Sequence, residues 1–123
     1  MYILGISALY HDSAVSLLKD GKIIFAAQEE RFTRIKHDPS FPTNALRECL
    51  NFCNLSLEQI DYIGFYEKPI KKFIRLLKTF LNNSPIGYKS FDNAMTEWFT
   101  NKLFLKKNIT NELFKLQQSL NKS

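Results

Sequence analysis

The sequence predicts an α/β fold in which three strands, a helix and a fourth strand are followed by three amphipathic helices. Three observations support this order. Asp20-Gly21 lies between two apolar runs, which is typical of a tight turn joining antiparallel strands. Apolar side chains then recur with the period of a helix from Leu46 to Cys53. From Lys68 onward, basic and apolar residues alternate at helical spacing.

The amino-terminal part of the chain predicts an antiparallel sheet. Residues 2–7 and 14–18 are apolar runs of strand length, and residues 8–13 connect them. The Asp-Gly turn leads into a third run over residues 22–28. Glycine supplies the positive φ that such a turn needs, and aspartate tolerates it. The polar groups of the 8–13 connection are therefore expected at one end of a strand.

A helix and a fourth strand are expected next. The apolar positions after Pro42 follow helical spacing: Leu46, Cys49, Leu50 and Cys53. This spacing predicts a helix over residues 43–54 that packs on the sheet. Residues 56–59 (SLEQ) have the pattern of a capping box, which predicts a short helical turn. Residues 60–66 then return to an apolar run of strand length, which completes a β-β-β-α-β order.

Three amphipathic helices are predicted in the second half of the chain. Pro69 suits the first turn of a helix whose apolar side chains share one face: Ile70, Phe73, Ile74, Leu77 and Leu81. The other face is basic: Lys71, Lys72, Arg75 and Lys78. Residues 82–85 (NNSP) end this helix, and residues 91–107 and 109–121 predict two more. Trp98 and several phenylalanines give more apolar surface than three short helices can bury, so we expect another surface to cover them.

The composition is that of a soluble globular chain. No apolar run approaches the length of about 18 residues that indicates a membrane span, and no signal-peptide pattern opens the chain. Cys49 and Cys53 fall on one apolar helix face, which predicts unpaired core thiols in a reducing compartment. These observations favour a cytoplasmic location.

The character of the chain changes near Lys68, which divides it into two predicted domains: residues 1–67, and a helical extension over residues 68–123. Residues 1–67 carry 6 basic and 9 acidic side chains, a net charge of −3, whereas residues 68–123 carry 11 basic and 3 acidic, a net charge of +8. The basic residues fall on polar helix faces and are not interleaved with aromatic side chains, so nucleic-acid binding is not expected. A solvated face and a face that docks on an acidic partner both remain open.

The first candidate site residues lie in the 8–13 connection. An imidazole is the usual base for deprotonating an alcohol, and a neighbouring carboxylate can orient its ring. His11 and Asp12 provide this pair, and a loop allows adjacent side chains to converge where a strand would point them apart. The same residues also fit a simple turn in which Asp12 and Ser13 cap backbone amides.

A second candidate region follows the third strand. Residues 29–38 (EERFTRIKHD) concentrate guanidinium, ammonium, imidazole and carboxylate groups in one short stretch. Such a cluster can hold a phosphate group, and arginine does so with two parallel hydrogen bonds. A mixed run of charges is also typical of a solvated loop.

The sequence predicts neither a metal site nor a phosphate-binding loop. His11 and His37 are the only histidines, too few for a convincing metal site. The glycines are scattered, and no GxGxxG or Walker pattern can be built from them: Gly5, Gly21, Gly64 and Gly87.

Several of these motifs resemble the start of the O-carbamoyltransferases of the nodulation and antibiotic-tailoring type. Those chains begin with a GIS-x-x-x-HD-S-A loop, a hairpin and a QEERFTR-x-KHD segment, which correspond to residues 5–14 and 28–38 here. The resemblance continues through FYEKP at residues 65–69 and, more loosely, to about Leu103. It implies that the β-β-β-α-β order is the start of an actin-like ATPase or ribonuclease-H-like domain.

The resemblance also implies roles for individual residues. His11 and Asp12 would be catalytic and lie beside the transferred carbamoyl group, with His11 as the general base. Four residues of the charged segment become substrate-binding candidates: Glu30, Arg31, Lys36 and His37. The ligands of a complete enzyme would be carbamoyl adenylate and a hydroxyl acceptor.

Such enzymes are several hundred residues long. The resemblance implies that they use ATP and iron through regions that this chain does not contain, so no cofactor is expected to be held by this chain alone. We therefore expect an amino-terminal fragment that is inactive without the remainder of the enzyme. The alternatives are a gene remnant, a non-enzymatic module that docks a partner through its basic helices, and a nucleotide-binding fragment without carbamoyl chemistry.

Overall fold

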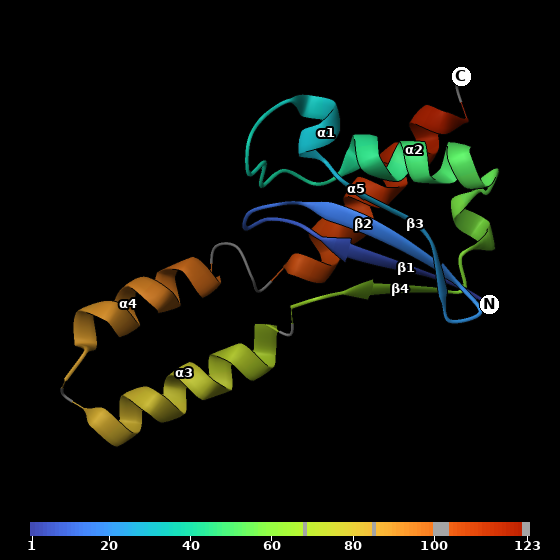
Figure 1. Ribbon diagram of the computed structural model, residues 1–123. Helices are drawn as coiled ribbons and strands as arrows, with labels where there is room; N and C mark the ends of the chain where they lie inside the picture. Colours follow the sequence, from blue (N-terminus) through green and yellow to red (C-terminus); the bar gives the residue numbers. More distant parts are fainter. Residues whose placement is uncertain (68, 85, 100–103, 122–123) are drawn as a thin grey trace. The chain divides into compact units, whose positions relative to one another are not determined.

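The computed structural model describes residues 1–67, 69–84, 86–99 and 104–121. Its elements follow in this order (Figure 1): β1 Tyr2–Ser7, β2 Ala14–Lys19, β3 Lys22–Gln28, α1 Glu30–Thr33, α2 Thr43–Cys53, a 3-10 turn Leu57–Gln59, β4 Tyr62–Phe65, α3 Pro69–Asn83, α4 Tyr88–Glu97 and α5 Leu105–Leu120. The described residues thus combine a four-stranded mixed sheet with five α-helices, which confirms the predicted α/β class.

The described residues form two compact units, and each is considered by itself. The first comprises Met1–Tyr66 together with Glu112–Ser123, and the second comprises Glu67–Asn111. The first unit therefore holds the sheet, α1, α2 and the end of α5. The second holds α3, α4 and the beginning of α5.

The strands of the first unit are ordered β3-β2-β1-β4. β2 pairs antiparallel with both β1 and β3, whereas β1 and β4 are parallel. The turn between β2 and β3 places Asp20 at φ 50° and Gly21 at φ 81°, in the left-handed region that this turn was predicted to need. The three predicted strands and their hairpin are confirmed.

β4 is shorter than the predicted strand over residues 60–66. The backbone N–H of Ile60 donates to the carbonyl of Leu57 at 3.2 Å and so completes the 3-10 turn. The carboxylate of Asp61 accepts the backbone N–H of Tyr2 at 2.6 Å, which ties the start of β4 to β1. The backbone N–H of Asp61 also donates to the carbonyl of Tyr2 at 3.0 Å, and the parallel pairing with β1 begins at the next residue, Tyr62.

α2 and the carboxy-terminal part of α5 cover one face of the sheet (Figure 1). The buried side chains of this face form one apolar cluster: Leu4, Ile6, Ala8, Val15, Leu17, Ala45, Leu46, Cys49, Leu50 and Leu116. α2 ends at Cys53 because Asn54 adopts the left-handed conformation at φ 51°. The predicted helix and its apolar face are confirmed.

The two cysteines are unpaired, as predicted. Cys49 is fully buried, whereas Cys53 is only half-buried. Burial raises the pKa of the Cys49 thiol to about 12, so this thiol stays protonated at neutral pH and packs as an apolar side chain.

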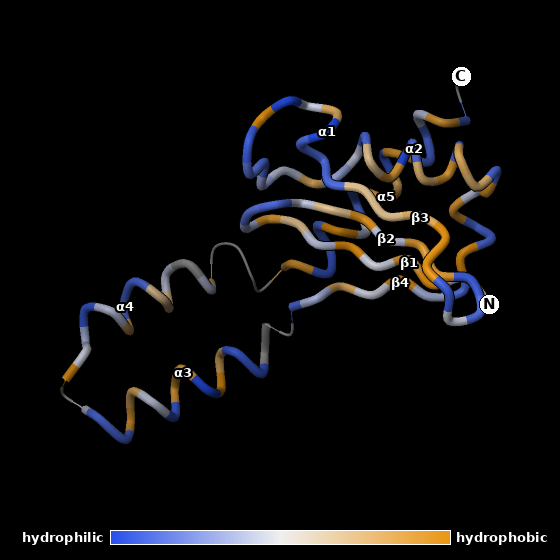
Figure 2. Tube along the Cα trace, viewed as in Figure 1, coloured by the Kyte–Doolittle hydropathy of each residue, from blue (hydrophilic) through white to orange (hydrophobic). Residues whose placement is uncertain are grey.

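The helices of the second unit pack through aromatic rings. Phe80 of α3 stacks on Phe91 of α4 with ring centroids 4.1 Å apart, and Phe73 lies 4.5 Å from Trp98. The hydropathy of α3 alternates along the helix, as its predicted amphipathic pattern requires (Figure 2). Among the described helices, none has both the length and the apolar character needed to span a bilayer.

The predicted helix over residues 91–107 has the wrong extent. α4 begins earlier, at Tyr88, directly after Gly87 at φ 85°, and it ends at Glu97. Residues 105–107 belong to α5, which the sequence predicted to begin at residue 109. Residues 100–103 lie outside the described residues. Apolar spacing continues through this region, so periodicity alone did not locate the boundary between the two helices.

Candidate functional site

Backbone hydrogen bonds join the β1–β2 loop to the segment that follows α1. Leu9 N–H donates to the carbonyl of Pro39 at 2.9 Å, and Ser13 N–H donates to the carbonyl of Asp38 at 3.0 Å. These bonds hold together two polar stretches that are well separated in the sequence. The two regions predicted to contain site residues therefore form one surface.

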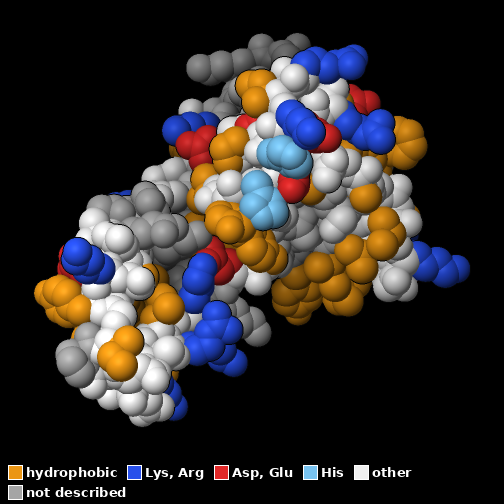
Figure 3. Space-filling view, turned by 60° about the vertical axis from the view of Figure 1, so that its left-hand side comes forward, with side chains coloured by type: hydrophobic (Ala, Val, Ile, Leu, Met, Phe, Trp, Pro, Cys, Tyr) orange, Lys and Arg blue, Asp and Glu red, His pale blue; other side chains and the backbone are white. Residues whose placement is uncertain are grey.

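The carboxylate of Asp12 binds both histidines of the chain. Its Oδ2 lies 2.7 Å from Nδ1 of His11, and its Oδ1 lies 2.7 Å from Nδ1 of His37. Glu30 joins this group because its Oε2 accepts the backbone N–H of His37 at 3.0 Å. Figure 3 shows the two imidazoles next to each other at the surface. We call these four residues the Asp12 cluster.

Hydrogen bonds inside the Asp12 cluster shift two pKa values. The bonds from His37 and His11 lower the pKa of Asp12, and the same carboxylate raises the pKa of His37. An ionised carboxylate can only accept hydrogen bonds, so Nδ1 of His11 and Nδ1 of His37 each carry a proton and donate a hydrogen bond to Asp12. A neutral ring held in this way keeps the lone pair of its Nε2. The arrangement can therefore take a proton from a hydroxyl group, with the carboxylate orienting the ring.

The backbone of both loops enters the left-handed region. Leu9 (φ 69°) and Asp12 (φ 51°) lie in the first loop, and Arg34 (φ 62°) and His37 (φ 58°) lie in the second. Aspartate and histidine visit this region more readily than most residues, whereas a leucine there is unusual. Such conformations persist where surrounding contacts impose them, and they concentrate at functional sites.

Asp38 fixes the shape of the second loop. It is buried, and its carboxylate accepts hydrogen bonds from Oγ1 of Thr33 at 2.7 Å and from Oγ of Ser40 at 2.6 Å. The backbone N–H of Ser40 adds a third bond at 2.9 Å. The bonds from Ser40 and Thr33 lower the pKa of Asp38. Because Thr33 ends α1, this network anchors the loop that presents His37.

Glu29 is also buried, and it caps α2. Oε2 of Glu29 accepts a hydrogen bond from the backbone N–H of Ala45 at 2.8 Å. Oε1 accepts two hydrogen bonds from Asn44, one from its backbone N–H at 3.1 Å and one from its side-chain Nδ2 at 2.7 Å. Amides in the first turn of a helix have no partner inside the helix, and their positive end attracts a carboxylate. The expectation of a solvated loop for residues 29–38 is therefore wrong at Glu29 and Asp38, and Glu30–Thr33 is helical.

The remaining two substrate-binding candidates do not join the Asp12 cluster. Arg31 lines a hollow over the sheet that no member of the cluster lines. Lys36 is exposed and forms no hydrogen bond or ion pair with any residue that the structure describes. The structure thus brings together His11, Asp12, Glu30 and His37 out of the six predicted residues.

Three members of the Asp12 cluster offer atoms that could bind a metal ion. One atom each of Asp12, Glu30 and His37 lie within 4.8 Å of one another, and one imidazole with two carboxylates suits a divalent transition metal. Both Asp12 oxygens and Oε2 of Glu30 already take part in hydrogen bonds within the cluster. The geometry is therefore explained without an ion, and the absence of a metal site stays a prediction.

Comparison with known proteins identifies the family. A family model described as "Carbamoyltransferase N-terminus" matches residues 2–122. An uncharacterized protein of Synechocystis sp. is 57% identical over 105 residues, which is 85% of this chain and 17% of that relative. The nodulation protein NolNO of Sinorhizobium fredii is 41% identical over 56 residues, or 46% of this chain and 8% of that protein.

A more distant relative is an uncharacterized protein of Methanocaldococcus jannaschii, which is 35% identical over 75 residues, or 58% of this chain and 14% of its own length. The chain thus spans less than a fifth of each of these three relatives. The matched family model, in contrast, extends over nearly all of the chain. The chain belongs to the carbamoyltransferase family and corresponds to its amino-terminal region.

Proposed function

We propose that this chain supplies the general base of a carbamoyltransferase that transfers a carbamoyl group from carbamoyl adenylate to a hydroxyl group. The observation that supports this most directly is the carboxylate of Asp12, which binds Nδ1 of both imidazoles at 2.7 Å. A ring held through Nδ1 can accept a proton at Nε2. Family membership supports the choice of carbamoyl transfer as the reaction.

In the proposed step, the acceptor oxygen attacks the carbamoyl carbon while its proton moves to Nε2 of His11. The new bond joins the acceptor oxygen to the carbamoyl carbon, and the bond from that carbon to the phosphate oxygen of the adenylate breaks. AMP leaves with the electron pair of that bond. Proton removal is required because a neutral hydroxyl is a weak nucleophile at neutral pH.

His37 has a different proposed role. Its pKa is raised by Asp12, so its ring is more often protonated than that of an ordinary histidine. A protonated imidazole favours the negative charge that develops on the transferred group and on the leaving phosphate. Asp12 would position both rings, and Glu30 would position the backbone of His37 through the bond at 3.0 Å.

The complete reaction needs more than this chain. The family resemblance implies that carbamoyl adenylate is made from carbamoyl phosphate and ATP, and that ATP and iron are held by the rest of such an enzyme. We expect the 123-residue chain to be inactive alone. The strand order β3-β2-β1-β4, with its one parallel pair, supports by analogy the proposal that the sheet starts an actin-like or ribonuclease-H-like domain.

The test uses this chain co-expressed with the part of the Synechocystis relative that lies outside the matched stretch. The purified assembly receives carbamoyl phosphate, ATP and a panel of sugar acceptors, and carbamoylated product is measured by mass spectrometry. His11→Ala should lower the transfer rate by about 10²- to 10⁴-fold, since this is the usual effect of removing a general base. The rate at which carbamoyl adenylate forms from carbamoyl phosphate and ATP should not change.

Glu48→Gln is the matched control, because Glu48 is an exposed acidic residue of α2 without a role in the Asp12 cluster. It should leave both half-reactions unchanged. An unchanged transfer rate in His11→Ala would show that the general base lies elsewhere. An assembly that forms carbamoyl adenylate but transfers it to no hydroxyl acceptor, even with His11 present, would contradict the proposed reaction.

A further inference from the structure

The face of the sheet opposite α2 is uncovered within the first unit. Alternation along each strand directs Leu4, Ile6 and Val15 into the core, so their neighbours Gly5 and Ser16 point to the other face. Large apolar side chains on that face are exposed: Ile23 by 69% and Tyr62 by 63%. Contiguous apolar surface of this kind is typical of an interaction site.

The side chains of the open face form rows across the strands. Paired residues make a first, bulky row: Ile23, Leu18, Ile3 and Tyr62. A second row contains only small residues: Ala26, Ser16, Gly5 and Gly64. A third row follows on three of the strands: Gln28, Ala14 and Ser7. The side chains of the second row therefore extend less far from the sheet than those of the first row.

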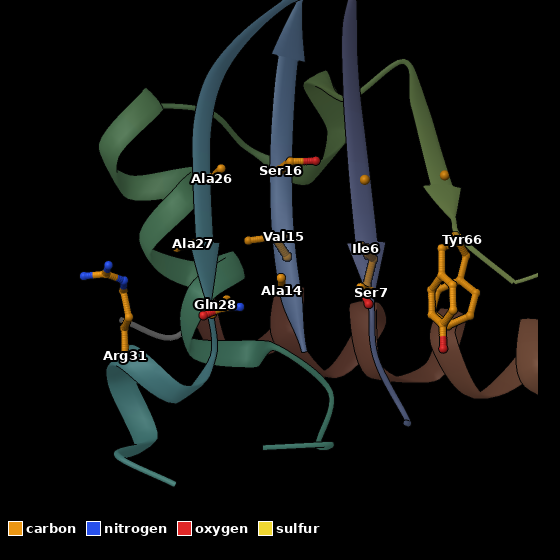
Figure 4. Close-up of a pocket in the computed structure, with 13 residues that line it drawn as sticks. Ile6, Ser7, Ala14, Val15, Ser16, Ala26, Ala27, Gln28, Arg31 and Tyr66 are labelled. Carbon is orange, nitrogen blue, oxygen red and sulfur yellow. The ribbon is translucent and has the colours of Figure 1, made fainter. Parts of the chain in front are cut away.

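A hollow of about 680 Å³ lies over the second and third rows (Figure 4). Figure 4 shows Ala26 and Ser16 on neighbouring strands, Arg31 beyond β3 and Tyr66 at the β4 side. The first and third rows lie four residues apart along β1, which corresponds to about 13 Å. An α-helix with its side chains is about 10–12 Å across, so the hollow has the width of one helix.

We propose that this open face is the docking surface for a helix from the remainder of the carbamoyltransferase polypeptide. The matched stretch is 17% of the Synechocystis relative and 8% of NolNO, so most of each relative lies outside it and is available to cover the face. The proposal rests on family membership and is independent of the role assigned to His11.

A helix fits this face better than an irregular segment. The backbone groups of the sheet are used in the strand ladder, so a segment lying on the apolar surface must satisfy its own backbone hydrogen bonds. A helix does so internally, and its bulky apolar side chains can fill the hollow above Gly5 and Gly64. Helices packed on a sheet face are the usual way to bury such a layer.

A positive charge at the edge of the hollow indicates which charge the docking helix carries. Arg31 lines the hollow and forms no ion pair with any described residue. A guanidinium group beside an apolar hollow favours a carboxylate on the docking segment. The proposed occupant is therefore an amphipathic helix with an acidic residue at the edge of its apolar face.

Gly64→Leu tests the surface without disturbing the isolated chain. A Cβ placed at Gly64 has no atom within 4 Å, and the residue does not need positive φ, so a leucine should fold normally and occupy the hollow. The tagged chain is co-expressed with the part of the Synechocystis relative outside the matched stretch. The wild-type chain should retain that partner at equal stoichiometry, and Gly64→Leu should retain at least tenfold less.

Glu48→Leu is the control, since it adds the same side chain to an exposed position on α2, and it should retain the partner as the wild-type chain does. Equal retention by Gly64→Leu, or no retention by the wild-type chain, would overturn the proposal. So would a wild-type chain that forms dimers by light scattering while Gly64→Leu is monomeric, because the occupant would then be a second copy.

A labelling experiment provides the second readout. Ala26→Cys places a thiol on the open face, and intact mass reports its reaction with a polar maleimide beyond the two native cysteines. Labelling should be fast in the isolated chain and at least tenfold slower in the assembly. Equal rates would exclude docking on this face. Slow labelling in the isolated chain would mean that residues 67–111 already cover it, which would also overturn the proposal.

Discussion

At Asp12, two stretches of sequence that each look like an ordinary polar loop become one chemical group. Its two carboxylate oxygens are each 2.7 Å from an imidazole nitrogen, one on the neighbouring residue and one on the loop after α1. The β1–β2 loop thus orients its own His11 and also His37 of the second loop. Asp12 therefore determines whether the proposed base has a fixed direction.

Replacing Asp12 by asparagine should lower the pKa of His37 toward its ordinary value of 6.5. The carboxylate raises that pKa through a hydrogen bond and through its charge, and asparagine removes the charge. The measurement is a pH titration of the two histidine ring signals by NMR in the isolated chain. A pKa of His37 that is the same in both proteins would contradict the assigned pairing, and Glu48→Gln serves as the control.

The same shifts predict how the pair contributes to stability at different pH. The pKa of Asp12 is lowered from 3.8, so its contribution is present above that value and is lost as pH falls through the lower folded-state pKa. The pKa of His37 is raised from 6.5, so its contribution is present below that value and is lost as pH rises through the higher folded-state pKa. Asp12→Asn should remove the contribution of Asp12 from the pH dependence of unfolding and reduce that of His37, whose pKa Glu30 also raises.

Sequence reasoning located the polar residues of the site but not the buried carboxylates that support it. His11, Asp12 and His37 could be recognised because imidazole and carboxylate groups are unusual next to apolar strands. Glu29 could not, since its burial depends on α2 beginning where Asn44 and Ala45 point their amides at it. Nothing in the local spacing of a charged run distinguishes a helix cap from a solvated side chain.

At the scale of single elements, the two glycines Gly21 and Gly64 make a matched pair. An added Cβ meets nothing within 4 Å at either position, but Gly21 lies at φ 81° and Gly64 does not have positive φ. Gly21→Ala should therefore destabilise the chain by about 1–2 kcal/mol, the cost of a left-handed conformation with a side chain. Gly64→Ala should change stability by less than about 0.5 kcal/mol or increase it slightly.

Urea denaturation of the two variants and the wild-type chain measures this difference. Equal losses of stability in Gly21→Ala and Gly64→Ala would mean that the left-handed conformation of Gly21 does not determine the cost of adding a side chain there. The comparison separates backbone strain from steric crowding, because open space is common to both positions.

Elements were predictable where a local rule acts alone. The Asp-Gly turn and the apolar spacing of α2 each depend on a few adjacent residues, and both appear where the sequence predicts them. α1 was missed because a helix of four residues has no full period of apolar positions. The boundary between α4 and α5 was misplaced because apolar spacing does not change where one helix gives way to the next.

The first unit as a whole is assembled from two separate parts of the chain. Residues 1–66 form the sheet and α2, and the end of α5 returns to them. Leu116 is 2% exposed and belongs to the same apolar cluster as Leu4 and Leu46. A division based on charge and composition predicts a boundary near residue 67, but it has no means of detecting a return that depends on one helix face far along the chain.

Leu116→Ala should destabilise the first unit by about 2–5 kcal/mol, the usual cost of truncating a buried leucine. Chemical denaturation followed by the fluorescence of tyrosines in the sheet region measures this loss. Leu81→Ala is the control, because Leu81 is 65% exposed on α3 and its truncation should cost less than about 0.5 kcal/mol. Equal effects of the two variants would show that the end of α5 is not part of the core.

The position of Leu116 in the core also has a consequence during synthesis. Ribosomes extend a chain at about 5–20 residues per second, so the stretch from the end of β4 to Leu116 takes roughly 3–10 s to make. A hairpin forms within microseconds. We therefore expect the nascent sheet to keep part of its apolar layer exposed for seconds, and we expect chaperones that bind emerging chains to recognise it during that interval.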